Sequence, residues 1–224
     1  LGNDFYNLNG SKNDSILFYN YLNLIYKDNN LKQNWYKPKF FLDNNVAEDN
    51  IVNYLRNFKN KVDKVLIFFS GHGLKDGKLK IKTKNSDYID DLNLLNILSK
   101  NIENSFELYI ILDCCYSGSF KIIPNQKIKT IKLMASCDKD QLSNEGITSF
   151  ENLIKENKLN YSKSKIIKKK DNVIVGIFTY NIIDLLYKLK LDDINEWVKI
   201  FNLESFWKKI YEVTKQKPIL FWKY

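Results

Sequence analysis

Short apolar runs and segments of helical spacing alternate along the chain. Residues 64–70 (KVLIFFS), 108–112 (LYIIL) and 130–136 (TIKLMAS) are nearly continuous in hydrophobic residues, which is typical of strands covered on both faces of a parallel sheet. Helical spacing predicts helices at residues 15–26, 47–58 and 90–102. The pattern also predicts a short strand after Pro38 and an exposed hairpin at residues 78–84.

The C-terminal half is interrupted by a lysine-rich gap without regular pattern, at residues 144–171, and such a stretch is most often a solvated loop. Residues 172–189 then change from strand-like to helical spacing, residues 194–215 predict one or two helices, and a closing strand follows Pro218. Because strands and helices alternate without a repeat, we expect an α/β sandwich with a mostly parallel sheet. Such sheets carry their active sites beyond the carboxyl ends of the strands.

Composition narrows the class of protein. Of the 224 residues 44% are hydrophobic, which suffices for a globular core, and no long apolar run or secretory signal pattern suggests a membrane partner. The odd number of cysteines (Cys114, Cys115 and Cys137) argues against a disulfide framework and favours an intracellular, cytoplasmic location. The net charge of +9 is spread along the chain without a nucleic-acid motif, so specific nucleic-acid binding is only a weak alternative.

Reactive side chains follow two of the predicted strands. His72, the single histidine, comes after the strand at residues 64–70, and Cys115 follows the strand at residues 108–112, 43 positions further on (115 − 72). Both should emerge at the same edge of a parallel sheet. A thiolate is the attacking species in acyl transfer, and an imidazole can take up its proton and return it to a leaving amine. The pair therefore predicts nucleophilic catalysis.

The glycines beside His72 allow the backbone to approach a substrate, and the backbone N–H groups of Gly73 and Cys115 are predicted to stabilise a tetrahedral oxyanion. The alternative is an ordinary surface histidine with two half-buried cysteines. A zinc site or a redox pair is disfavoured, because neither the C-x-x-C nor the H-x-x-x-H spacing occurs.

These motifs resemble a known family. SGHG after one strand and DCCYSG after the next resemble the two signatures of the caspase-like cysteine peptidases, in particular the metacaspases and their bacterial relatives, and in caspases the histidine precedes the cysteine by about 50 residues. The segments LNGSKND, MASCDKDQLSNEG and GIFTYNIIDLL extend the resemblance over nearly the whole chain. It implies a three-layer α/β/α sandwich with a mostly parallel sheet, the caspase-like fold, in a single domain over residues 1–224.

The resemblance also implies roles for individual residues. The position before Tyr-Ser-Gly is the family's nucleophile, which makes Cys115 the attacking residue and leaves Cys114 to packing. The family's substrate pocket matches Asp14, Ser70 and Asp113, and its carboxylates would favour arginine or lysine through charge-assisted hydrogen bonds. Asp14 fits equally well as the N-cap of the following helix. Tyr116 departs from the histidine that many metacaspases have there.

Calcium is the one cofactor that the resemblance suggests. Its candidate ligands here are Asp76, Asp90 and Asp91, since carboxylates are proper calcium ligands. However, a further acidic ligand of the family is replaced within SFKIIPN, and Asp90 and Asp91 also fit acids at a helix start. The peptidase chemistry itself requires no cofactor.

Within the domain the resemblance implies a large-subunit-like region (residues 1–146), a lysine-rich linker loop (147–171) and a small-subunit-like region (172–224). LGND at the start lies where the family finishes its first strand, so most of that strand is expected to be missing from this sequence. Family members often cut themselves in the linker loop, where the candidate sites here are Lys163, Lys165, Lys168, Lys169 and Lys170.

The sequence therefore predicts a cysteine endopeptidase that cleaves after Arg or Lys through an acyl-enzyme. It would act as a monomer on protein or peptide substrates with basic residues, without specific nucleic-acid or membrane partners. The alternative is a catalytically silent module of the same fold that serves interaction or regulation.

Overall fold

A central β-sheet organises the structure, a computed structural model that describes residues 9–27, 36–42, 45–56, 62–123, 126–149, 172–189, 207–208, 210–212 and 215–223. The strands of the sheet, in spatial order, are β1 (Lys64–Gly71), β2 (Phe106–Cys114), β3 (Ile128–Ala135) and β6 (Ile219–Lys223). β1, β2 and β3 are parallel neighbours, whereas β6 runs antiparallel to β3. A separate antiparallel pair consists of β4 (Glu145–Ser149) and β5 (Asn172–Gly176).

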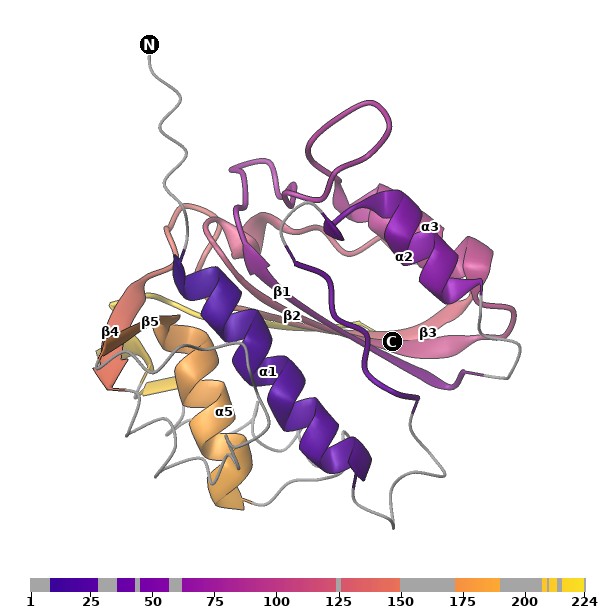
Figure 1. Cartoon of the computed structure of the whole chain (residues 1–224). Coiled ribbons are helices and arrows are strands. Elements are labelled where there is room, and N and C mark those ends of the chain that lie inside the picture. Colours follow the sequence, from indigo (N-terminus) through magenta and orange to yellow (C-terminus); the bar gives the residue numbers. More distant parts are fainter. Residues whose placement is uncertain are drawn as a thin grey trace.

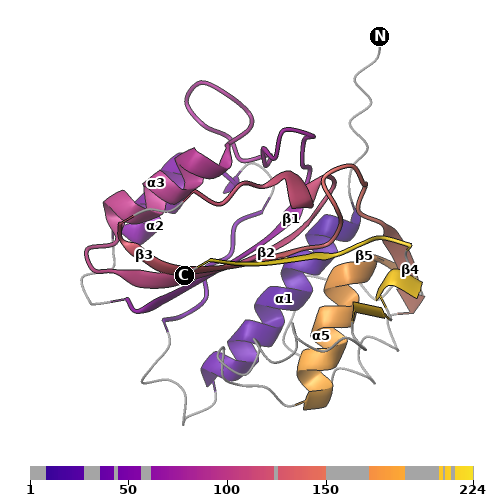
Figure 2. The ribbon, with the colours of Figure 1, turned by 180° about the vertical axis from the view of Figure 1, so that it is seen from behind.

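Helices cover both faces of the sheet. One face carries α1 (Asn9–Lys27) and α5 (Ile177–Leu189), and the other carries α2 (Glu48–Leu55) and α3 (Asp91–Asn101) (Figures 1 and 2). Each side has its own buried hydrophobic cluster. The predicted α/β/α sandwich with a mostly parallel sheet is confirmed.

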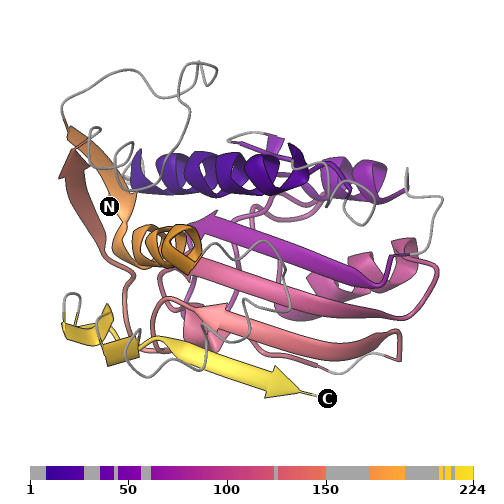
Figure 3. The ribbon, with the colours of Figure 1, turned by 90° about the horizontal axis from the view of Figure 1, so that it is seen from below.

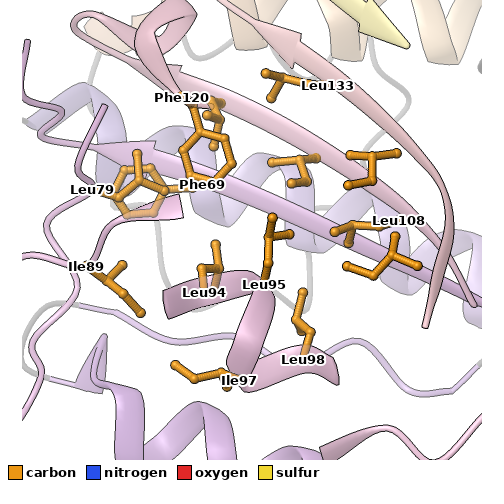
Figure 4. Close-up of a cluster of buried hydrophobic side chains, with 14 of the residues drawn as sticks. Phe69, Leu79, Ile89, Leu94, Leu95, Ile97, Leu98, Leu108, Phe120 and Leu133 are labelled. Carbon is orange, nitrogen blue, oxygen red and sulfur yellow. The ribbon is translucent and has the colours of Figure 1, made fainter. Parts of the chain in front are cut away.

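The central strand β2 shows why its sequence is continuously apolar. Successive side chains of a strand point to opposite faces, and here both faces are buried. Tyr109 and Ile111 pack in the cluster with α1 and α5. Leu108 and Ile110 pack in the other cluster, where the leucines of α3 point up at the sheet (Figure 4). The same alternation directs Asp113 toward the side of α1 and α5.

Most predicted elements are present with shifted ends, but two are not. Residues 36–42, expected to include a strand after Pro38, form none. Their aromatic side chains pack on helices instead: Phe40 stacks on Tyr19 of α1 at 4.9 Å, and Phe41 meets Tyr54 of α2 edge-on. The hairpin expected at residues 78–84 is reduced to isolated bridges, such as Leu79 with Ile89.

The sequence pattern also missed β4. Residues 147–149, assigned to the linker loop, belong to this strand, which pairs with β5 from Glu145↔Gly176 to Ser149↔Asn172. The polar and glycine content of EGITS weakens the strand signal, and Ile147 is 73% exposed. The first-strand prediction at the N-terminus, the lysines of the linker loop and most of the predicted C-terminal helices lie outside the described residues. Among the helices that are described, none has the length and apolar character needed to cross a membrane.

Candidate active site

The two predicted catalytic residues follow neighbouring strand ends. Gly71, the last residue of β1, pairs with Cys114, the last residue of β2, so His72 and Cys115 occupy the next position on each chain. The carboxyl ends of β1, β2 and β3 all point toward the side of the molecule where β4 and β5 lie (Figure 3). Parallel pairing thus brings the two turns together at one edge of the sheet, as predicted.

Gly73 keeps the histidine turn in direct contact with the cysteine turn. A β-carbon on this residue would collide with the carbonyl oxygen of Cys115 and would lie 2.9 Å from Sγ of Cys114. Backbone therefore packs on backbone at this point, which only a glycine permits. The backbone carbonyl of His72 accepts a hydrogen bond from the N–H of Lys80 at 3.0 Å, which secures the other side of the histidine turn.

The turn after Cys115 is held in an unusual backbone conformation. Tyr116 has φ 58° and ψ 23°, the left-handed region that a bulky residue seldom adopts. Its N–H donates to the carbonyl of Gln141 at 2.8 Å, and the Lys75 ammonium lies 5.8 Å from its ring centre. Strained residues of this kind cluster at active sites, because the surrounding structure must hold them. Here the left-handed conformation changes the direction of the chain immediately after the candidate nucleophile.

The β3–β4 loop, residues 136–144, also holds that turn in place by hydrogen bonds. The N–H of Gly118 donates to the carbonyl of Cys137 at 3.0 Å, and the N–H of Cys137 donates to the Ser117 hydroxyl at 3.2 Å. Sγ of Cys137 lies 3.4 Å from the carbonyl oxygen of Cys114. Cys114 and Cys137 are buried, whereas Cys115 is only half-buried and is the accessible thiol of the three.

The protonation states of the pair follow from their surroundings. Burial raises the pKa of the Cys115 thiol above its usual 9.0, although the backbone N–H of Ser143 opposes this shift. Burial, and then the positive charge of Lys80, lower the pKa of His72 below 6.5. Near pH 7 the resting forms are therefore a thiol and a neutral imidazole. In this state the imidazole is able to accept the thiol proton during attack, as a general base does.

Two carboxylates converge beside the strand ends, on the face of α1 and α5. Asp14 in α1 accepts hydrogen bonds from the Ser70 hydroxyl at 2.9 Å and from the N–H of Gly176 at 2.7 Å. Ser70 is the register partner of Asp113, whose carboxylate accepts from Thr179 at 2.7 Å through its hydroxyl. The structure thus brings Asp14, Ser70 and Asp113 together. Since α1 already begins at Asn9, the interpretation of Asp14 as a helix N-cap is wrong.

Both carboxylates are held in an environment that disfavours their charge. Burial, and then repulsion by Asp113, raise the pKa of Asp14 well above 3.8. Burial likewise raises the pKa of Asp113, against the lowering effect of its hydrogen bonds with Ser143 and Thr179. A positively charged group between the two carboxylates would reverse this penalty, because an opposite charge favours the ionised form.

Sequence reasoning missed the residues that support these carboxylates. Gly176 has no side chain to separate its N–H from Asp14, and a β-carbon there would collide with Asp113. The hydroxyl of Ser143 donates to Asp113 at 2.5 Å. Glu145 does not support them: its carboxylate contacts the first turn of α1 at Gly10, and its charge adds to the effects of burial and Asp113 that raise the pKa of Asp14. Gly176 and Ser143 lie in segments that carried the family resemblance, but their spacing gave no sign of a common target.

The three predicted calcium ligands are not grouped as a ligand set. Asp76 forms an exposed ion pair with Lys78 at 2.6 Å. Asp90 is the N-cap of α3 and accepts from the N–H of Asn93 at 2.7 Å, and Asp91 is the first residue of that helix. In the part of the chain that the structure describes, no group of three or more His, Cys, Asp and Glu side chains suits a metal ion. These residues thus do not fit a calcium site, and Asp90 serves as the helix-start acid that the sequence also allowed.

Comparison with known proteins gives one match. The model of the Peptidase_C14 family, described as a caspase domain, matches residues 1–186, most of the chain and all of the site described above. A search of curated proteins found no match.

Proposed function

Because this chain belongs to the caspase domain family of cysteine peptidases, we propose that it is an endopeptidase that cleaves peptide bonds after Arg or Lys. His72 acts as general base and acid, and Cys115 is the nucleophile. The observation that supports this proposal best is the paired ending of β1 and β2 at Gly71 and Cys114, directly before these two residues and beside the buried carboxylates of Asp14 and Asp113.

The proposed reaction begins with the thiol and the neutral imidazole. As the sulfur of Cys115 bonds to the substrate carbonyl carbon, the thiol proton passes to His72. The backbone N–H groups of Gly73 and Cys115 stabilise the resulting oxyanion, at about 3 kcal/mol for each donor. The carbon–nitrogen bond then breaks as His72 protonates the leaving amine. Water, deprotonated by the same imidazole, hydrolyses the remaining thioester and restores the thiol.

The proposed preference for basic residues rests on Asp14 and Asp113. A guanidinium or ammonium group that enters between them would receive charge-assisted hydrogen bonds, roughly twice as strong as neutral ones. It would also remove the mutual repulsion that contributes to the raised pKa of Asp14. A substrate with a neutral side chain at this position would leave both carboxylates uncompensated, so the same pocket selects against it.

Short fluorogenic peptides that end in Arg, Lys or Asp test the proposal. We expect turnover with the Arg and Lys peptides, little with the Asp peptide, and none with the Cys115→Ala protein. Each reaction is run with and without millimolar calcium. The structure does not group Asp76, Asp90 and Asp91. A calcium response that is retained in Asp76→Asn and Asp90→Asn would mean that other residues bind the calcium.

Two outcomes would contradict the proposal. Cleavage after Asp but not after Arg or Lys would mean that the carboxylates do not form the substrate pocket. If folded wild-type protein turns over none of the three peptides, the alternative of a catalytically silent module gains support. Circular dichroism of each preparation shows whether the protein tested is folded.

We further propose that the enzyme processes itself in the linker loop, where Lys163, Lys165, Lys168, Lys169 and Lys170 are the candidate sites. The proposal rests on the basic preference above, because that preference would recognise these lysines. Purified wild-type protein should resolve into two fragments on a denaturing gel, with new N-termini after one of these residues, and Cys115→Ala should stay intact. An intact wild-type band that nonetheless cleaves peptides would contradict self-processing alone.

A further inference from the structure

Ser143 contacts the carboxylate side of the site through its side chain. Its hydroxyl donates to Oδ1 of Asp113 at 2.5 Å, while Oδ2 of the same carboxylate accepts from the N–H and the hydroxyl of Thr179 at 3.1 and 2.7 Å. Asp113 is thereby held between the β3–β4 loop on one side and the start of α5 on the other. Ser136 of the same loop also hydrogen-bonds to this carboxylate through its side chain.

The same loop contacts the nucleophile. The carbonyl of Gln141, two residues before Ser143, accepts the N–H of Tyr116, and Tyr116 follows Cys115 directly. The backbone N–H of Ser143 hydrogen-bonds to the Cys115 thiol and so opposes the rise in its pKa that burial causes. The loop is in turn secured from the C-terminal side, because the N–H of Lys217 donates to the side-chain oxygen of Gln141 at 2.9 Å.

The short separation along the chain explains how one residue can reach both groups. Asp113 lies near the end of β2 and Cys115 in the turn directly after it, so their α-carbons are at most roughly 7 Å apart. The hydroxyl and the backbone N–H of one serine are close enough together to lie between them. The hydroxyl bond fixes the orientation of Ser143 relative to Asp113.

We propose that Ser143 is a positioning residue that couples the carboxylate pocket to the nucleophile. Its hydroxyl bond to Asp113 keeps its backbone N–H directed at the sulfur of Cys115. This coupling rests on the proposed function, because it requires that a basic side chain of the substrate fills the pocket. A bound cation keeps Asp113 ionised, and the Ser143 hydroxyl bonds more strongly to an ionised partner than to a neutral one. The cation also offsets the negative charge of Asp113, which otherwise opposes ionisation of the Cys115 thiol. A filled pocket therefore favours the reactive thiolate.

Alkylation of Cys115 by iodoacetamide measures this coupling without any need for peptidase activity. The thiolate is the reacting species, and the buried Cys114 and Cys137 contribute little, so the rate at pH 7.5 follows the thiolate fraction of Cys115. We expect Ser143→Ala to alkylate about tenfold more slowly than wild type, the effect of one hydrogen bond to a charged group. The pH dependence of the rate should shift to higher pH by the corresponding amount.

Matched variants distinguish the loss of the Ser143 hydroxyl bond from a general disturbance of the fold. Ser143→Thr keeps the hydroxyl and should alkylate nearly as fast as wild type, whereas the isosteric Ser143→Val should be as slow as Ser143→Ala. The control is Ser119→Ala, which removes a serine hydroxyl that donates to the carbonyl of Lys139 in the same loop, at 3.2 Å, without contact to Asp113. It should alkylate like wild type. If Ser143→Ala does not fold, the Thr and Val pair carries the test.

The coupling through Asp113 is tested by a double-mutant cycle. In an Asp113→Ala background, Ser143→Ala should have little further effect on the alkylation rate, because its partner is already gone. Additive effects, or equal rates for the Thr and Val variants, would overturn the proposal. Peptide turnover without any Ser143 effect would refute this inference alone. A Ser143 effect in a protein that cleaves no peptide would refute the proposed function and leave the coupling in place.

Discussion

Replacing His72 with alanine is expected to lower kcat/KM for an Arg peptide by about 10²- to 10⁴-fold, the contribution of a positioned general acid and base. The loss is expected to be large because the Cys115 thiol does not ionise by itself near neutral pH: burial raises its pKa above 9.0. Without the imidazole the thiol loses its proposed proton acceptor, and the leaving amine loses its proposed proton donor. Initial rates at peptide concentrations well below KM provide the measurement.

The pH dependence of kcat/KM tests whether His72 is the base. The neutral imidazole is the active form, so activity is lost as the pH falls through the pKa of His72, which burial and Lys80 lower below 6.5. The acid limb of the wild-type profile should therefore have its midpoint below pH 6.5. In His72→Ala this limb should disappear, and the residual rate should rise with the thiolate fraction toward pH 9 and above.

Lys80→Gln is the matched control for this assignment. It leaves both catalytic side chains in place and removes the positive charge that lowers the pKa of His72, so the acid limb should move to higher pH while the plateau is retained. An acid limb that persists unchanged in His72→Ala would contradict the assignment and would point to the pocket carboxylates as its source.

The sequence was sufficient to predict the positions of those site residues that depend only on strand geometry. Continuous apolar runs predicted β1 and β2, and parallel pairing then required that His72 and Cys115 emerge together. Alternation along β2 puts Asp113 on the face of Ile111, toward α1, where Asp14 lies. These placements depend only on a period of two and on which face is covered, and both can be inferred from the order of apolar residues.

The residues that the sequence did not reveal depend on tertiary contacts. The left-handed conformation of Tyr116 is disfavoured locally and is held by Gln141, which is distant in the sequence. Ser143 and Gly176 approach the carboxylates only because the β3–β4 loop and β5 fold back over the strand ends. The described structure does not group the three predicted calcium ligands, and Asp90 instead caps the helix that it begins.

Asp113→Asn should lower kcat/KM for an Arg peptide by roughly 10²- to 10⁴-fold, since removing one partner of a buried charge pair costs about 3 to 5 kcal/mol. The cost falls on the complex with a charged substrate. In a peptide with citrulline in place of arginine, the side chain keeps nearly the same shape without the charge, and kcat/KM for this peptide should change little. The ratio of the two values is the measurement.

The free protein should tolerate this substitution well. The pKa of Asp113 in the folded state is raised by burial, so its carboxyl stabilises the fold most below the unfolded value of 3.8, and this contribution is lost as the pH rises through the folded value. At pH 7 an asparagine removes the cost of the buried charge and, with it, part of the bonding to Ser143 and Thr179. These effects oppose one another, so the melting temperature should change far less than the activity.

Glu107→Gln provides the control, because it makes the same chemical change near the start of the same strand, where Glu107 accepts from the Tyr109 hydroxyl at 2.9 Å. This variant should keep the wild-type ratio of Arg to citrulline. If Asp113→Asn lowers both peptides equally, Asp113 acts on the nucleophile or on the fold and does not recognise substrate charge. A lowered ratio with an unchanged melting temperature would instead assign the charge preference to this carboxylate, since neither Cys115 nor His72 distinguishes the two side chains.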